Sequence, residues 1–194
     1  MSAIAVLRAA DRRPQRWKNG GGVTSEVVAF PPGAGMEDFD WRISIAEVAE
    51  AGPFSRFDGV DRVLTVIEGE LALAFEAQAA PVILDDRSRP FAFAADAPVS
   101  GAPLDGPVRD LNVMVRRGKA RATVERVLAR PGTSLEPDHA GVVVLIALDG
   151  LTIVTSGEDR VLAPLDAVMT DGGLCCTVTA GTDIARLVLV ALFF

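Results

Sequence analysis

The chain has 194 residues, of which 49% are hydrophobic and 23% are charged, and its formal net charge is −7. This balance is typical of a globular protein with a filled hydrophobic core. The negative charge argues against nucleic acid and anionic membranes as partners, because both need a basic surface on the protein. A small anion can still bind where a few Lys or Arg side chains converge.

The start of the chain carries no recognisable targeting signal. Residues 1–7 form a short apolar run, and charged residues follow from Arg8 onward, which is not the pattern of a signal peptide. No apolar stretch approaches the roughly 20 residues of a membrane-spanning helix. The two cysteines, Cys175 and Cys176, are adjacent, so a disulfide between them would be strained. We therefore expect a cytoplasmic protein.

In chain order, strand signals dominate and helix signals are scarce. Residues 44–50 fit either one or two helical turns or a strand with a polar edge. Residues 62–67 are rich in β-branched side chains, an acidic-Gly turn follows at residues 68–69, and apolar residues alternate over 71–75. This pattern predicts a β-hairpin. Short strands follow it at residues 90–94 and 111–115.

A second hairpin of the same form occupies residues 142–155, and Gly150 in its turn can be laid over Gly69 of the first. Short strands follow it at residues 160–162, 166–169, 175–179 and 185–190. The matching order of elements indicates an internal repeat of about 80 residues. We therefore expect an all-β protein of two barrels, each with about six to eight strands, that join near residues 116–119.

The densest polar cluster lies at residues 17–22. Trp17, Lys18 and Asn19 precede three glycines, which let a ligand approach the backbone and offer bare N–H groups to an anion. Either this segment lines a pocket, with Lys18 as counter-ion and Asn19 as donor, or it is a Gly-rich turn with Trp17 packed in the barrel wall. It is not a phosphate loop, because the Gly-Lys-Ser/Thr ending is absent.

Polar residues also interrupt three predicted strands of the first half. Alternation puts Arg42 and Ser44 on one strand face, which either lines a binding site or faces solvent. Arg62 either pairs with Asp61 or directs its guanidinium at a carboxylate. Asn112 breaks an apolar run, so a buried Asn112 needs a hydrogen-bond partner from the backbone or from a ligand.

Histidine and cysteine chemistry has few candidate residues. His139 is the single histidine, and the adjacent Cys175 and Cys176 lack the spacing of metal ligands. Zinc, iron and manganese sites usually need two or three His with carboxylates, so we expect no metal and no cofactor. Catalysis of the Ser-His-Asp or Cys-His kind would depend on His139 alone, without a Gly-x-Ser-x-Gly motif. The candidates for acid–base catalysis by carboxylates are Glu26, Glu47 and Asp61.

Four ordered motifs resemble those of the HutD/Ves family of bacterial cupin-like proteins. They are WKNGGGVTSE (residues 17–26), FDWRISIA (39–46), GPFS with GVDR (52–55 and 59–62), and DLNVM with RRG (110–114 and 116–118). The resemblance is close over residues 1–118 and loose beyond them. It implies a bicupin fold, with an N-terminal cupin-like barrel over residues 1–118 and a C-terminal cupin-like barrel over residues 119–194.

The resemblance also implies a link to histidine utilisation, where HutD is thought to moderate flux or sense an intermediate. It places a ligand pocket in the first barrel. Carried over residue by residue, the ligand-binding positions are Trp17, Lys18, Asn19, Gly20, Gly21, Arg42, Ser44, Arg62 and Asn112. The expected ligand is a small anionic metabolite, such as N-formylglutamate or urocanate, bound without a metal ion.

Other interpretations stay open beside a non-catalytic binding protein. One is a metal-free isomerase or hydrolase of a related carboxylic acid, with Lys18 or Glu26 as acid or base. Another is a structural or interaction module whose polar motif residues only hold the barrels together. The apolar segment at residues 187–194 either supports a homodimer or forms an internal strand.

Overall fold

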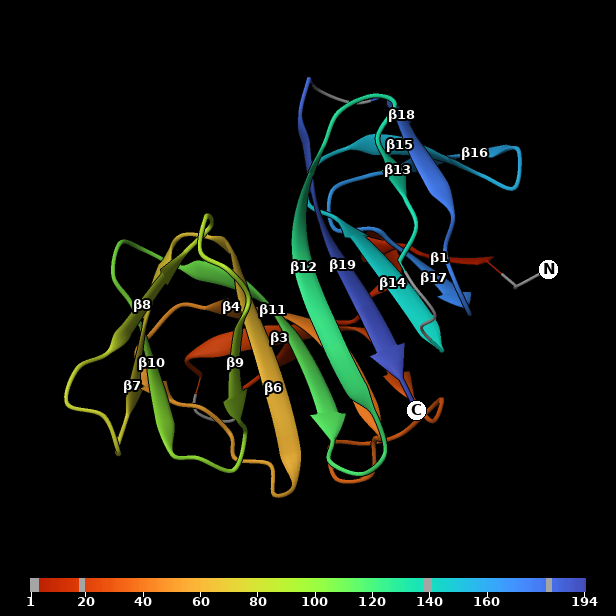
Figure 1. Cartoon of the computed structure of the whole chain (residues 1–194). Helices are drawn as coiled ribbons and strands as arrows, with labels where there is room; N and C mark the ends of the chain where they lie inside the picture. The colour runs from red at the N-terminus through yellow and green to blue at the C-terminus, as the bar shows by residue number, and fades with distance from the viewer. Residues whose placement is uncertain (1–3, 18–19, 138–140, 181–182) are drawn as a thin grey trace. The chain divides into compact units, whose positions relative to one another are not determined.

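Strands make up nearly all of the regular structure (Figure 1). The computed structural model describes residues 4–17, 20–137, 141–180 and 183–194. Within them, the only helical element is a short 3-10 helix, η1 (Ala9–Asp11), and none of the described segments forms a helix that could cross a membrane. The all-β prediction is confirmed. The segment that fitted either helix or strand lies mainly in strand β4 (Trp41–Val48).

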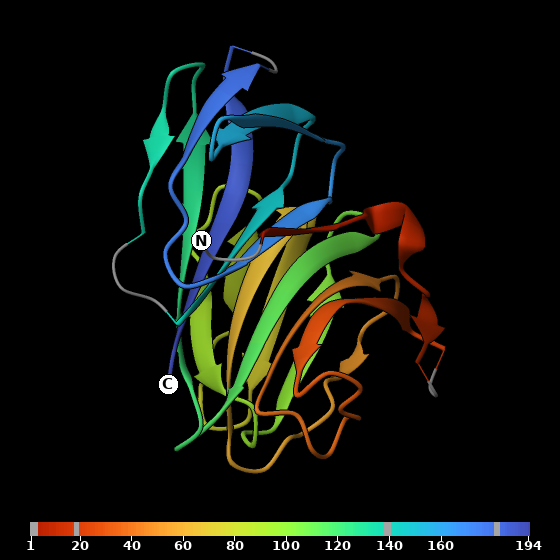
Figure 2. The ribbon, with the colours of Figure 1, turned by 90° about the vertical axis from the view of Figure 1, so that its right-hand side faces the viewer.

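The chain divides into an N-terminal unit, Arg13–Ala120, and a C-terminal unit that combines Met1–Arg12 with Arg121–Phe194. The sequence predicts a division after residue 118 with everything before it in the first half. The difference arises because β1 (Ile4–Leu7) pairs with β17 (Ala167–Asp171) of the C-terminal unit (Figure 2). A four-residue apolar run does not specify which sheet edge it joins, so the sequence alone could not place it.

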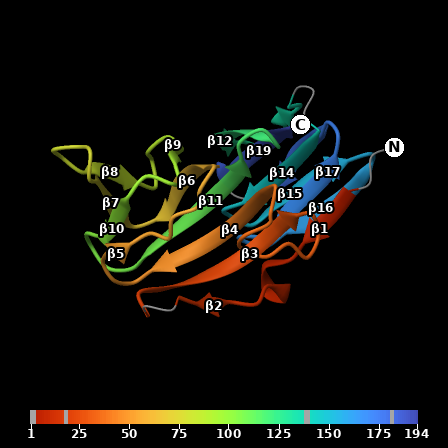
Figure 3. The same ribbon diagram turned by 90° about the horizontal axis from the view of Figure 1, so that it is seen from below.

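The N-terminal unit holds two antiparallel sheets. Its six-stranded sheet has the order β2-β3-β4-β11-β6-β9, which Figure 3 shows with β3, β4, β11 and β6 side by side, and its four-stranded sheet has the order β5-β10-β7-β8. The bounds of these strands are β2 (Gln15–Arg16), β3 (Gly22–Phe30), β5 (Gly52–Pro53), β6 (Val60–Glu68), β7 (Glu70–Phe75), β8 (Val82–Asp85), β9 (Phe91–Ala94), β10 (Val99–Pro103) and β11 (Val108–Arg116).

The C-terminal unit also holds two antiparallel sheets. The five-stranded sheet has the order β1-β17-β14-β19-β12, and the four-stranded sheet has the order β13-β18-β15-β16. The remaining bounds are β12 (Arg121–Ala129), β13 (Ser134–Leu135), β14 (Val142–Ala147), β15 (Leu151–Thr155), β16 (Glu158–Leu162), β18 (Cys176–Ala180) and β19 (Ala185–Phe193).

The two units repeat one order of eight strands. The order β4-β11-β6-β9 in the first unit corresponds to β12-β19-β14-β17 in the second, and β5-β10-β7-β8 corresponds to β13-β18-β15-β16. Each strand from β4 to β11 therefore has its counterpart eight strands later. This agreement supports the predicted internal repeat. The two predicted hairpins were wrong, because β6 and β7 lie in different sheets and so do β14 and β15. Each pair of strands is consecutive in the sequence, but the turn carries the chain from one sheet to the other, and each strand pairs with more distant ones. Within the described residues the strands form four sheets with open edges, where the prediction had two closed barrels.

Each unit has its own hydrophobic core between its two sheets. In the N-terminal unit, Leu64 and Val66 of β6 pack with Leu71 and Leu73 of β7 and with Phe54. A sheet pair that shares one core in this way is a β-sandwich arrangement.

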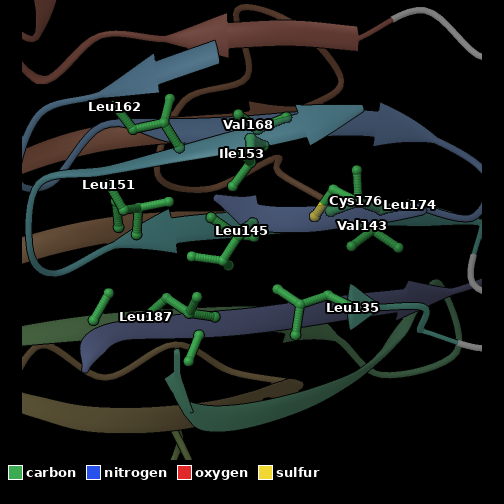
Figure 4. Packing of buried hydrophobic residues seen from close by; sticks show 14 of the residues in the cluster. Leu135, Val143, Leu145, Leu151, Ile153, Leu162, Val168, Leu174, Cys176 and Leu187 are labelled. Atoms are coloured by element: carbon green, nitrogen blue, oxygen red, sulfur yellow. The ribbon is translucent and has the colours of Figure 1, made fainter. Parts of the chain in front are cut away.

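The core of the C-terminal unit gathers side chains from nearly all of its strands, and Figure 4 shows them interleaved. Leu145 and Leu187 are fully buried there, and the Cys176 side chain packs among them. Both cysteines are free thiols. β19 pairs with β12 on one edge and with β14 on the other, so the terminal apolar segment is an internal strand. The homodimer stays a prediction, without a free edge on this strand to support it.

Candidate functional site

Three neighbouring strands of the six-stranded sheet turn polar side chains towards the same face. Asn112 of β11 lies opposite Ser44 of β4 on one side and Leu64 of β6 on the other. Two residues further along, Met114 lies between Arg42 and Arg62 in the same way. Because side chains on one face recur every second residue, all of these residues share a face. With strands about 4.8 Å apart, the two arginines start from positions roughly 10 Å apart.

A chain of hydrogen bonds links three buried residues on this face. The Nε and Nη2 atoms of Arg62 donate to Oδ1 of Asn112, at 2.8 and 2.5 Å. The Nδ2 atom of Asn112 donates to Oδ1 of Asp110 at 2.5 Å. All three side chains are buried, with Asp110 completely inaccessible. Asn112 therefore connects a buried guanidinium to a buried carboxyl group, and its amide orientation follows from the chemistry of its two partners.

Arg42 is held by a second set of contacts. Its Nε atom donates to Oε2 of Glu26 at 2.9 Å, and its Nη1 atom donates to Oγ of Ser44 at 3.0 Å. Arg42 and Ser44 are buried, while the Glu26 side chain is about half exposed. The pair thus runs from the covered face of the sheet to the surface.

Aromatic rings surround Arg62. Its Cζ atom lies 4.5 Å from the centre of the Phe54 ring and 5.6 Å from that of Phe93, so both rings contribute cation–π attraction. Trp17 meets Phe54 edge to face, with ring centres 6.4 Å apart. The Trp17 ring also packs on Gly22, where an added Cβ would lie 3.1 Å from the ring and 2.6 Å from the Glu47 carbonyl oxygen. Only glycine fits at that position.

Burial shifts the pKa values of the two charged residues that Asn112 connects, Arg62 and Asp110. Burial lowers the pKa of Arg62 to about 10, with Arg42 acting in the same direction and Asp110 opposing it. Burial also raises the pKa of Asp110 to about 6, against the opposing effects of Arg62 and the Asn112 hydrogen bond. The Arg62 guanidinium therefore stays charged at neutral pH, while the Asp110 carboxyl group titrates just below neutral pH.

The two arginines keep unused hydrogen-bonding capacity. The Nη2 atom of Arg42 and the Nη1 atom of Arg62 have no hydrogen-bond partner in the part of the chain that the structure describes. Arg42 also acts to lower the pKa of Arg62, because it is a like charge on the same face of the sheet. Two nearby guanidiniums with spare N–H groups can be bridged by an anion.

The structure brings most of the predicted site residues into one region. Arg42, Ser44, Arg62 and Asn112 share one face of the sheet, and Trp17 reaches them through Phe54. Gly20 and Gly21 lie in the tight loop behind Trp17, where the Gly20 N–H donates to the Trp17 carbonyl and the Gly21 carbonyl accepts from the Ala49 N–H. Lys18 and Asn19 lie outside the described residues, as does His139.

One of the alternatives posed for these residues is now resolved, and those posed for Arg62 and Asn112 were wrong. Arg42 and Ser44 face inward and are buried, so the solvated-face alternative is excluded. Arg62 contacts an amide oxygen rather than Asp61, which instead accepts a hydrogen bond from Arg117. Sequence reasoning missed this because it considered only opposite charges as partners for Arg62.

Asn112 also departs from the prediction, since its partners are side chains and neither backbone nor ligand is needed. Asp110, Phe54 and Phe93 also belong to the site, although the motifs did not single them out. For Asp110 a signal was available, because it lies two residues before Asn112 and so shares its face.

A surface hollow of about 480 Å³ lies elsewhere on the N-terminal unit. Its lining includes Met36, Phe57, Arg56 and Arg116 and none of the predicted site residues. Arg116 is already engaged by the carbonyl oxygens of Glu37 and Phe39. We therefore assign the candidate site to the buried polar face and not to this hollow. No cluster of three or more His, Cys, Asp or Glu suited to a metal ion occurs among the described residues.

The comparisons with known proteins agree with this set of motifs. A family model described as HutD matches residues 9–186. The chain belongs to the HutD family. This HutD-family chain is 36% identical over 148 residues to a 21.2 kDa protein in the hutC 3′ region of Pseudomonas putida, covering 76% of this chain and 75% of that one. It is 41% identical over 132 residues to Protein Ves of Citrobacter koseri, covering 68% and 66% of the two chains.

Solved structures give the same result in three dimensions. HutD of Pseudomonas fluorescens SBW25 is 33% identical, with a TM-score of 0.82 over 98% of both chains. A conserved protein of Pseudomonas aeruginosa PAO1 is 32% identical, with a TM-score of 0.89 over all of both chains. A cupin 2 conserved barrel domain protein of Leptotrichia buccalis, at 12% identity and a TM-score of 0.60, shares the fold alone. The all-β fold is therefore cupin-like.

Proposed function

We propose that this HutD-family protein binds a small anionic metabolite at Arg42 and Arg62 and thereby moderates histidine utilisation. The observation that carries the proposal is the pair of buried guanidiniums with N–H groups that the described residues leave unused. Charge-assisted hydrogen bonds from such groups contribute about 1.5–3 kcal/mol each. Ser44 holds Arg42 in place, and Asn112, itself bonded to Asp110, holds Arg62. Trp17 and Phe54 form the apolar wall of the proposed anion site.

The proposal includes a bicupin organisation in which the N-terminal unit binds and the C-terminal unit supports. The repeated order of eight strands favours a duplication, and the cupin-like neighbours favour barrels as its units. Lys18 and Asn19, adjacent to Trp17 in the sequence, would complete the site as a further cation and donor. The proposal assigns no metal ion to the site, because zinc, iron and manganese sites usually need two or three His and the sequence holds one.

Histidine utilisation is supported by the relatives alone. One relative is encoded in the hutC 3′ region, and one solved relative is named HutD, its structure being described as that of a formate condition. Intermediates of histidine breakdown carry carboxylates, which is the chemistry that a pair of arginines selects. N-formylglutamate and urocanate are therefore the first ligands to test, with glutamate and formate as smaller probes.

Isothermal titration calorimetry with these four anions tests the proposal. We expect at least one of them to bind, and we expect Arg42→Gln and Arg62→Gln each to weaken binding about 10- to 100-fold, because each removes charge-assisted hydrogen bonds. Arg117→Gln is the matched control, since Arg117 is an exposed arginine of the same unit that pairs with Asp61 and Asp96. It should bind like the wild type.

Three results would contradict the proposal. The absence of heat with all four anions, together with an unchanged melting temperature, would leave the polar face with a structural role only. Equal binding by the wild type and both glutamine variants would place the site elsewhere. Conversion of a bound anion to a product, detected by NMR, would show that the protein is an enzyme and not a binding protein. Arg62→Lys keeps the buried charge and serves if Arg62→Gln does not fold.

A further inference from the structure

Asp110 is a buried carboxyl group to which the anion site gives no direct role. Its Oδ1 atom accepts from Asn112, but its Oδ2 atom is buried and has no hydrogen-bond partner among the described residues. Its ladder neighbours are Ala46 on β4 and Val66 on β6, neither of which has a polar side chain. Most buried polar atoms in proteins are paired, so an unpaired carboxylate oxygen at this depth requires an explanation.

The charged groups that face Asp110 are few. Among the described residues they are Arg62 on β6, Arg42 on β4 and Glu26 on β3. Arg109, the basic neighbour on β11 itself, belongs to the opposite face and pairs with Glu47 and Glu68. None of the buried polar or charged side chains among the described residues belongs to the facing four-stranded sheet. Arg62, reached through Asn112, is therefore the main positive charge that compensates an ionised Asp110.

We propose that Asp110 takes up a proton when an anion binds to Arg42 and Arg62, so that anion binding and protonation are coupled. This inference rests on the proposed function. An anion at Arg62 uses the charge that stabilises the Asp110 carboxylate and adds a second negative charge nearby, and both effects favour the neutral acid. The Oδ2 atom is completely covered, so a proton fits there and a larger ligand atom does not.

The expected pH dependence follows from the free protein. Without an anion, the pKa of Asp110 is about 6, so the group is mostly ionised at pH 7. With an anion bound the pKa is higher, because the anion opposes the charge of Arg62. Below pH 6 both states are protonated and affinity is independent of pH. Above pH 6 the affinity falls by up to about tenfold per pH unit until the pKa of the bound state is passed.

Calorimetry in several buffers measures the coupling directly. N-formylglutamate is the main probe and formate the second, because their carboxylates, with ordinary pKa values near 4, remain ionised above pH 5.5. The titrations use bis-Tris, imidazole and Tris at pH 7, which differ in ionisation enthalpy and are not anions. We expect uptake of roughly 0.5 to 1 proton per bound anion.

Two matched variants assign the proton. Asp110→Asn removes the proposed acceptor, so proton uptake should vanish and affinity should become independent of pH. Glu26→Gln removes the other carboxylate that faces the site, and it should change affinity while keeping proton uptake. Loss of proton uptake in Glu26→Gln, or its persistence in Asp110→Asn, would overturn the assignment to Asp110.

The outcomes separate this inference from the proposed function. Anion binding without proton uptake at pH 7 refutes the coupling and leaves the proposed function intact. The absence of binding by any anion between pH 5.5 and 8 refutes both. If Asp110→Asn does not fold, the carboxyl ¹³C resonance of Asp110 in the wild type replaces it. Its titration midpoint should rise when formate is added and should not move if the coupling is absent.

Discussion

β11 of the N-terminal unit and β19 of the C-terminal unit hold the same place in the repeated strand order. β11 lies between β4 and β6, and β19 lies between β12 and β14. On the face that points to the core, β11 carries Asp110 and Asn112, whereas β19 carries Ala185, Leu187 and Ala191. The same strand order therefore holds a wholly apolar core in the C-terminal unit, whereas in the N-terminal unit an apolar core lies beside a charged network.

This difference argues that folding does not require the polar network. Burying a guanidinium and a carboxyl group is expensive even when the two are paired, and apolar side chains of similar volume often give a more stable core. The C-terminal unit has the apolar solution. A charged network that the fold does not require is what the proposed anion-binding role predicts for the N-terminal unit.

The largest expected effect comes from placing a polar side chain in the apolar core of the C-terminal unit. Leu187→Asn should lower the free energy of unfolding by about 5 kcal/mol, because it removes a fully buried side chain and leaves an amide without a partner. Urea denaturation measures the loss, and Leu187→Met, which conserves volume, should lose less than about 1.5 kcal/mol. A Leu187→Asn protein within 1 kcal/mol of the wild type would show that this core accommodates polar groups as the other one does.

The next largest effect comes from removing the buried positive charge of Arg62 from the N-terminal unit. Arg62→Met should lower the free energy of unfolding by about 4 kcal/mol, because Asn112 loses both of its donors and Asp110 loses its compensating cation. The triple variant Arg62→Met, Asp110→Ala, Asn112→Leu replaces this hydrogen-bonded network with apolar side chains, while Arg42 and Ser44 stay buried on the same face. It should recover part of the loss while anion binding stays absent. An unaffected Arg62→Met protein would mean that the network contributes nothing to stability.

The sequence allowed much of this comparison to be predicted. The four strands on either side of Gly69 and Gly150 were visible as local patterns, but their pairing was not, because the two strands at each turn lie in different sheets. Strand β12 was not visible, because residues 121–129 mix charged and apolar side chains and most of them stay partly exposed. Its place depends on its pairing with all nine residues of β19, which is a long-range interaction that no local pattern encodes.

The candidate site was predictable in composition but not in geometry. Alternation correctly put Arg42 and Ser44 on one face, yet whether that face pointed inward depended on the second sheet. The bond from Arg62 to Asn112 joins residues 50 positions apart. It could only be found once β6 and β11 were seen to be neighbours. Asp110 was passed over because a surface carboxylate and a buried one look the same in a sequence.

The pH dependence of stability offers a smaller but specific test. The pKa of Asp110 is about 6 when folded and near 4 when unfolded, so the folded state binds the proton more tightly. Its contribution is fully present below pH 4 and is lost as the pH rises to 6, by up to about 3 kcal/mol. The lowered pKa values of Asp149 and Asp166 act in a lower window, below pH 4. Urea titrations at pH 4 to 7 should show this loss in the wild type.

Asp110→Asn provides the control for that series. The unfolding free energy of the wild type minus that of Asp110→Asn should fall as the pH rises from 4 to 7, whichever of the two proteins is more stable. A difference that stays constant over this range would mean that Asp110 ionises at an ordinary pKa in the folded protein, and the charged interior would then resemble an exposed site.

The smallest effect concerns the packing beneath Arg62. A Cβ at Gly101 would lie 2.5 Å from Cε1 of Phe54, the ring whose centre is 4.5 Å from the Arg62 guanidinium. Gly101→Ala must displace that ring, so we expect a loss of about 1–2 kcal/mol in stability and weaker anion binding. Gly150→Ala is the control in the other unit, because its nearest atoms would be 3.9 Å away and the same unfolded-state benefit applies. If the two variants are equally stable and bind equally well, Phe54 does not hold Arg62 in position, and the hydrogen bonds to Asn112 suffice to orient it.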